Sequence, residues 1–160
     1  MIKFTGLLLV FLFSALGGHL LAKREKEQIE SAEGMLFLIR TIRQNVAFFR
    51  IHLDEIYQHF TYPSLQGSDF LQILKQRGLK DAYLSEKERF GYDSFTETRF
   101  LSFTETVGKL PIDEQIKSCD LLCDLLEEKL REMKADFPKK KKLYNVLGIS
   151  LGIVLIILFI

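Results

Sequence analysis

Two apolar stretches at the ends of the sequence constrain this chain more than any other feature. Residues 4–22 and 143–160 contain no Asp, Glu, Lys or Arg, although 27% of the 160 residues are charged. At about 1.5 Å per residue, an 18-residue helix reaches about 27 Å, close to the roughly 30 Å of a bilayer's hydrocarbon core. Transmembrane helices are therefore predicted at residues 1–22 and 143–160, with a domain of residues 23–142 between them.

The basic residues beside the two stretches predict how the chain is oriented. Lysine and arginine are enriched on the cytoplasmic side of membrane helices. The middle domain should therefore be cytoplasmic, with both chain ends outside, and six residues should anchor it against membrane lipids: Lys23, Arg24, Lys139, Lys140, Lys141 and Lys142. An alternative interpretation takes residues 1–17 as a cleaved signal peptide, which would carry the four lysines across the membrane against this rule.

The middle domain shows the hydrophobic spacing of long helices. Apolar residues recur at alternating steps of four and three within residues 35–60 and 112–137. No proline interrupts residues 24–62 or 112–137, so each range is predicted to form one long helix. Further apolar residues beside each series widen the buried faces beyond those of a two-stranded coiled coil. The predicted fold class is all-α, a cytoplasmic antiparallel helical bundle flanked by an N-terminal and a C-terminal transmembrane helix.

Turn-forming residues divide the segment between the two long helices. A turn is expected at Pro63, after which Gly78 should end a first short helix. Residues 81–90 are expected to form a second short helix, and Ser94 to cap a third. Pro111 fits the first turn of the last long helix.

Candidate catalytic and metal-binding residues are few, and each has a simpler explanation. His52 and His59 are seven residues apart on one helix face, about 10 Å, which is too far for one metal ion unless other ligands intervene, and they are expected to be exposed. Cys119 and Cys123 are one helical turn apart, close enough to share a soft metal ion, but both lie on an apolar helix face and are expected instead to be small core residues. The sequence contains no glycine-rich phosphate-binding loop and no HExxH motif. No catalytic site, cofactor, metal or small-molecule substrate is therefore expected.

The balance of charge argues against nucleic acid as a partner. Of the 22 basic residues only Lys3 lies outside residues 23–142, which leaves 21 basic and 21 acidic residues in the middle domain. Proteins that bind nucleic acid through its phosphates carry a strong positive excess. No nucleic-acid partner is expected.

Small residues at four-residue spacing occur in both apolar stretches. Gly148 and Gly152 form a GxxxG pair in the second stretch, and Gly18 and Ala22 form a similar pair in the first. In lipid such pairs let two helix backbones approach closely. The apolar helices are therefore predicted to pack through these four residues, either on each other or on a partner.

Several sequence segments together resemble the stage III sporulation protein AB family. The first apolar stretch ends in GHLLAK (Gly18 to Lys23), the segment LIRTIRQNV is similar to the family's long first helix, and the sequence LYNVLG followed by Gly152 is similar to its closing KLWxxLGxxxG block. The family usually has a Gly and a Thr-Pro step between its first two helices, and residues 45–53 have neither.

The resemblance implies a role rather than a reaction. The family is similar to the inner-membrane platform proteins of type II secretion machines, whose cytoplasmic parts are helical bundles. It implies a multi-pass protein of the mother-cell membrane around the forespore, which docks a cytoplasmic secretion-type ATPase and contacts other subunits of a channel complex. The face formed by the short middle helices is expected to contact the ATPase. A generic membrane-anchored adaptor or signalling scaffold, and an exported enzyme with a cleaved leader, are the alternatives.

Overall fold

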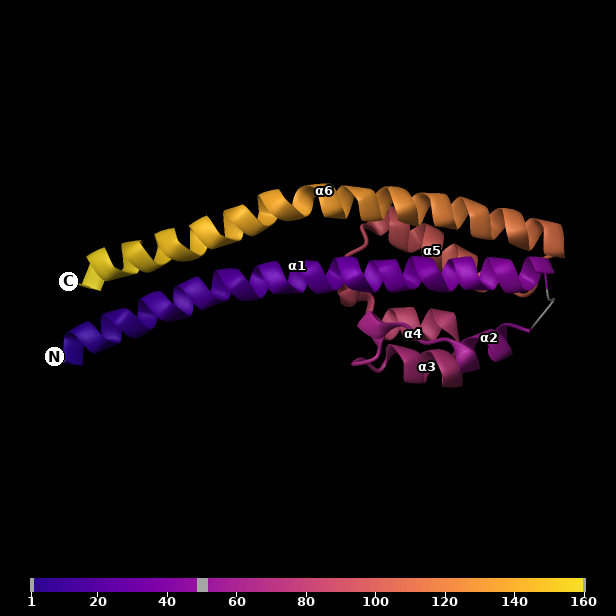
Figure 1. Cartoon of the computed structure of the whole chain (residues 1–160), viewed down its shortest axis with the longest axis horizontal. Coiled ribbons are helices and arrows are strands. Elements are labelled where there is room, and N and C mark those ends of the chain that lie inside the picture. Colours follow the sequence, from indigo (N-terminus) through magenta and orange to yellow (C-terminus); the bar gives the residue numbers. More distant parts are fainter. Residues whose placement is uncertain (1, 49–51, 160) are drawn as a thin grey trace. The chain divides into compact units, whose positions relative to one another are not determined.

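The chain is helical throughout the part that the structure describes. The computed structural model describes the backbone of residues 2–48 and 52–159, and the side chains of residues 16–47, 52–154 and 157. Every regular element in these ranges is a helix and none is a strand (Figure 1), so the all-α prediction is confirmed.

Two long helices enclose a series of short ones along the chain. The long helices are α1 (Ile2–Phe48, 47 residues) and α6 (Ile112–Phe159, 48 residues). Between them lie, in chain order, α2 (Leu53–His59), the 3-10 turn η1 (Pro63–Leu65), α3 (Phe70–Arg77), α4 (Leu79–Ser85), the 3-10 turn η2 (Lys87–Arg89) and α5 (Ser94–Thr106).

The helices form two compact units. The bundle unit comprises residues 27–132, and the helix-pair unit comprises residues 1–26 together with 133–160. The long helices contribute to both units, whereas all the short helices belong to the bundle unit. The division predicted from the sequence, into transmembrane helices at residues 1–22 and 143–160 and a middle domain of residues 23–142, stays a prediction.

The core of the bundle unit comes from the two apolar series of the long helices. Arg40 Nη2 lies 2.6 Å from Glu127 Oε1, and Arg43 pairs with Asp120. Because the partner's number falls as the number on α1 rises, α1 and α6 run antiparallel here. The buried members of the two series are Met35, Ile39, Ile42 and Val46 on α1 and Cys119, Cys123, Leu126 and Leu130 on α6.

The structure shows that the prediction of one helix over residues 24–62 is wrong. α1 ends at Phe48 and α2 begins at Leu53 after an extended residue (φ −66°, ψ 144°); residues 49–51 lie outside the described residues. The break returns the chain toward α1, where the rings of Phe37 and Phe60 lie 6.1 Å apart. In one straight helix these two residues would be about 35 Å apart. Burial of the apolar face of α2 therefore requires the break.

Three other boundaries differ from the expectations. α6 does not stop before Pro138 but continues through it, although proline cannot donate a helical hydrogen bond. The expected helix over residues 81–90 begins instead directly after Gly78, whose positive φ of 87° allows the sharp turn from α3 into α4. The cap of α5 is Asp93 rather than Ser94, since the Asp93 carboxylate accepts a first-turn backbone N–H at 2.8 Å.

A cluster of aromatic rings connects the short helices. Its centroid separations range from 4.6 Å between Tyr83 and Phe100 to 6.4 Å between Tyr92 and Phe100. Burial raises the pKa of Tyr92, which is therefore neutral, and its buried hydroxyl has no hydrogen-bond partner in the described part of the chain. The members of this aromatic cluster are Phe70, Tyr83, Phe90, Tyr92 and Phe100.

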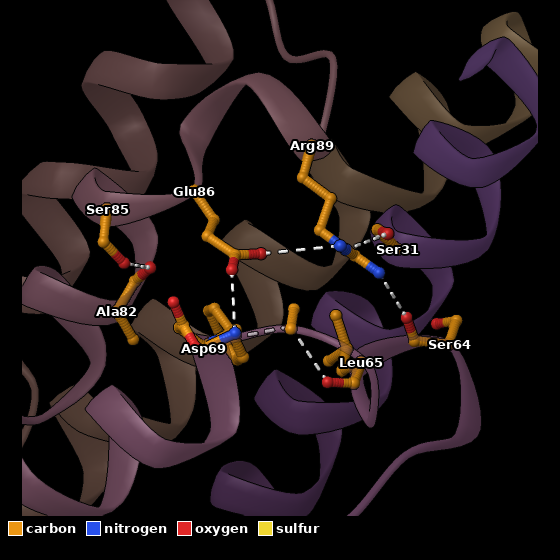
Figure 2. A network of polar contacts seen from close by, with 10 residues as sticks. Ser31, Ser64, Leu65, Asp69, Ala82, Ser85, Glu86 and Arg89 are labelled. Carbon is orange, nitrogen blue, oxygen red and sulfur yellow. Dashed lines mark hydrogen bonds and ion pairs between the residues drawn. The ribbon is translucent and has the colours of Figure 1, made fainter.

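A polar network around Arg89 joins the short helices to α1 (Figure 2). Arg89 donates from Nε to the Ser31 hydroxyl at 3.2 Å and from Nη2 to the Ser64 carbonyl at 3.0 Å. Its Nη1 lies 3.6 Å from a Glu86 oxygen, and the other Glu86 oxygen accepts the Asp69 backbone N–H at 2.9 Å. The Ser31 side chain is completely buried, so Arg89 supplies a hydrogen bond in a place closed to solvent.

Replacing Arg89 by alanine should destabilise the bundle unit by about 2–3 kcal/mol, because a buried hydroxyl and a carbonyl lose their charged donor. The measurement is denaturant unfolding of the full chain in detergent. The matched control is Arg77→Ala, which removes an exposed arginine of α3 and should change stability by less than about 0.5 kcal/mol. Equal effects of the two substitutions would contradict a structural role for the network.

Candidate membrane-anchoring and docking surfaces

Within the helix-pair unit, the backbones of the two long helices approach closely at Gly18. A Cβ added to Gly18 would lie 2.5 Å from the carbonyl oxygen of Tyr144 and 3.6 Å from the Cα of Gly148. Ala22 and Gly152 are buried and Gly148 is half-buried. The four small residues named from the sequence are thus shielded from solvent, and at Gly18 only a glycine fits without moving a backbone.

Glu25 sets the register of this helix pair. Its two carboxylate oxygens accept hydrogen bonds from Lys140 Nζ at 2.9 Å and from the Tyr144 hydroxyl at 3.0 Å. Since Gly18 faces Tyr144 and Gly148, the two segments run antiparallel. The bases after the first apolar stretch therefore lie level with those before the second. They form one basic cluster, whose exposed members are Lys23, Arg24, Lys26, Lys139, Lys140, Lys141 and Lys142.

Apolar side chains dominate the exposed surface of the same unit beyond the basic cluster. Large exposed apolar patches are rare on soluble monomers and mark contacts with proteins or membranes. The large apolar side chains exposed in this unit are Leu16, Leu20 and Leu21 of α1 and Leu143, Val146, Leu147, Ile149, Leu151, Ile153, Val154 and Ile157 of α6.

The predicted transmembrane spans are only partly covered by described side chains. Among the residues that could be searched, no helix has a stretch sufficiently long and apolar to cross a bilayer. Side chains of residues 1–15, 155, 156 and 158–160 lie outside the described ones. Transmembrane helices at the two ends of the chain stay a prediction.

The histidines and cysteines are separate in the structure. His52 and His59 are exposed, whereas Cys119 and Cys123 are buried core residues, as predicted. Burial raises the pKa of the Cys119 thiol to about 12 and that of the Cys123 thiol to about 11, so both are protonated at neutral pH. Among the described residues no group of three or more His, Cys, Asp or Glu side chains could hold a metal ion.

An open apolar groove lies between α5 and α6 in the bundle unit. Its volume is about 470 Å³, and its walls include Phe95, Phe103 and Leu122. The Arg99 guanidinium lies 5.4 Å from the centre of the Phe95 ring. Two serine hydroxyls, Ser102 and Ser118, also line it. This α5–α6 groove offers apolar burial and one positive charge, which suits binding rather than proton transfer.

The groove was not recognised from the sequence, although a signal was present. Phe95, Arg99 and Ser102 follow one another at helical spacing, and Leu121 and Leu125 do the same on α6. Such steps place residues on one face of a helix, but only the pairing of the two helices shows that these faces meet. The salt bridge from Asp93 to Lys129, at 2.8 Å, joins the helices beside the groove.

Gly18→Ala should loosen the helix pair, because the added methyl group meets a backbone oxygen. Hydrogen–deuterium exchange of the full chain in detergent should then be faster for residues 133–148, by about tenfold for a cost of about 1.4 kcal/mol. Gly17→Ala is the matched control, since an added Cβ there has nothing within 4 Å. Unchanged exchange in Gly18→Ala would contradict the close approach.

The two native thiols should be nearly inert while the chain is folded. Because their pKa values are raised by burial, alkylation by a maleimide at pH 8 should be about 100-fold or more slower than in the denatured chain. Mass spectrometry of the labelled protein measures this difference. Gly67→Cys, at an open turn position, provides a thiol that should react rapidly in the same sample. Equal labelling of all three thiols would show that the core around Cys119 is open.

Comparison with known proteins identifies a family over nearly the whole chain. The family model described as stage III sporulation protein AB matches residues 3–160. No curated protein and no solved structure matches the chain. The match includes both apolar ends and every short helix, and the chain belongs to the stage III sporulation protein AB family.

Proposed function

We propose that this chain is a non-enzymatic membrane component of the channel complex between mother cell and forespore, where it acts as a platform for a cytoplasmic secretion-type ATPase. Membership of the family indicates a stage III sporulation protein. The membrane location in the mother cell, the absence of a reaction and the ATPase partner go beyond that membership. The mother cell and the ATPase are what the family resemblance implies, and the surfaces of the two units support a membrane contact and a docking role.

The single observation that carries the membrane location is the basic cluster on an otherwise apolar helix pair. Each exposed lysine or arginine near an anionic leaflet contributes about 1 kcal/mol of attraction. The Glu25 carboxylate also accepts a hydrogen bond from the Tyr144 hydroxyl at the level of the bases. In the proposed arrangement this level is the boundary between hydrocarbon and headgroups. An antiparallel pair with its bases on one side fits two spans that enter from the cytoplasm.

The docking role is supported by the character of the bundle unit. α3 and α4 present an exposed surface on which Leu84 is 44% exposed, beside the exposed side chains of Arg77, Lys80 and Asp81. A small apolar centre within a charged rim is typical of transient protein interfaces. The serines in the α5–α6 groove have no imidazole beside them in the described lining, which favours a binding function over hydrolysis.

The orientation can be tested by cysteine accessibility in intact cells. Gly67→Cys should react with a membrane-impermeant maleimide only after permeabilisation, because the bundle unit is proposed to be cytoplasmic. When the chain is produced in non-sporulating cells, where its membrane is the cell surface, Lys3→Cys should react in intact cells. The readout is the fraction labelled, and an alkaline phosphatase fusion after Ile160 should be active. Labelling of Gly67→Cys in intact cells would overturn the cytoplasmic placement.

The ATPase contact can be tested by co-purification with the full chain in detergent. Leu84→Arg should lower recovery of the secretion-type ATPase at least about tenfold, because a charge at an apolar interface centre costs more than about 1.4 kcal/mol. Thr98→Arg places the same charge on the exposed surface of α5 and should leave recovery unchanged. If the unaltered chain does not retain the ATPase, the docking role is wrong.

A further inference from the structure

We propose that the face formed by α5 and α6 is a self-association surface on which two copies of this chain pack as a parallel two-fold dimer. This inference concerns the bundle unit alone and does not depend on membrane insertion or on the ATPase. Shape, helix geometry and charge on this face point to the same occupant.

The shape of the face is complementary to itself. Leu121 is 72% exposed, more than any other large apolar side chain described in the bundle unit, and Phe95 is 61% exposed. Leu121 stands at the edge of the α5–α6 groove, which is open and lined by apolar side chains. A projecting side chain and a receptive groove on one face allow two copies to exchange them reciprocally, as an isologous interface requires.

The helix geometry selects the parallel arrangement. Leu122 and Leu125 line the groove and so lie on the α5 side of Leu121. At about 100° per residue, Asp124 lies about 60° from Leu121 on the opposite side. Consider a two-fold axis parallel to α6 that places each Leu121 in the groove of the other copy. This axis also places α5 of one copy against the side of the other copy's α6 that carries Asp124. Such an axis also keeps residues at the same height along the two copies.

Charge completes the match at that position. Lys129 of α6 donates a hydrogen bond to Asp93, the cap of α5, at 2.8 Å. Because α5 and α6 run antiparallel, Arg99, six residues after Asp93, is level with residue 123, six residues before Lys129. In the parallel dimer, Arg99 of each copy therefore faces Asp124 of the other. Both side chains are exposed. Within the described residues the Arg99 guanidinium lies over the Phe95 ring, and neither Arg99 nor Asp124 has an ion pair.

The alternative antiparallel packing does not allow this reciprocal exchange. A two-fold axis that lies in the face and runs perpendicular to α6 leaves α5 of both copies on the same side of the interface. It places groove against groove and Leu121 against Leu121, so neither Leu121 enters the groove of the other copy.

The test is crosslinking of the full chain in membranes with a short bismaleimide. Ser118→Cys adds a thiol in the groove near the two-fold axis and preserves Leu121, while the two native thiols are buried. Dimers of Ser118→Cys are expected on denaturing gels. Ser85→Cys, an equally conservative change on the exposed surface of α4, should remain monomeric.

Charge reversal then separates this dimer from a nonspecific one. Arg99→Glu and Asp124→Arg should each reduce the Ser118→Cys crosslink about tenfold, and the two together should restore it, because the ion pair is rebuilt with its charges exchanged. Each variant is first checked for an unchanged circular dichroism spectrum. No dimer above the Ser85→Cys level, no rescue by the double reversal, or crosslinks only to a different protein would overturn the proposal.

Discussion

The antiparallel contact of α1 and α6 in the bundle unit is the constraint on which its short helices depend. Helices of seven or eight residues are unstable alone in water, and α2, α3 and α4 have these lengths. They persist because the long helices provide a surface on which they bury their apolar sides. Arg89 adds a directional link, since from η2 it donates hydrogen bonds to a buried hydroxyl of α1 and to a carbonyl of η1.

The helix-pair unit uses a different combination of forces. Close backbone approach at Gly18 brings its helices together, and the Glu25 carboxylate fixes how far one is shifted along the other. That shift gathers bases separated by more than a hundred residues of sequence into one cluster. The bundle unit, by comparison, contains cross-helix ion pairs such as Arg40 with Glu127. The two units therefore present different electrostatic surfaces.

Much of the fold could be predicted from hydrophobic period, while its turns could not. The four-three series correctly placed Met35, Ile39, Cys119 and Cys123 in the core. The break between α1 and α2 was missed because the apolar series continues across it: Val46 and Ile56 are both buried, so periodicity alone cannot distinguish one helix from two. Asp93 and Ser94 are both good capping residues, and only the fold decides between them.

The candidate sites were predictable to different degrees. The lysine run before residue 143 and the small residues of the apolar ends are visible in sequence, because each is a local pattern. The alignment of the bases after residue 22 with the lysine run before residue 143 is not visible in the sequence. It depends on a tertiary contact between Glu25 and Lys140. The α5–α6 groove was missed for the same reason: each of its walls resembles an ordinary half-buried helix face until the neighbouring helix is known.

The aromatic cluster has a consequence for how the bundle unit opens. Its rings join α3 to α4 through Phe90 and α4 to α5 through the contact of Tyr83 with Phe100. When any one of these helices moves away, rings on the others lose buried contacts and meet water. The three short helices are therefore expected to open together, as one cooperative unit.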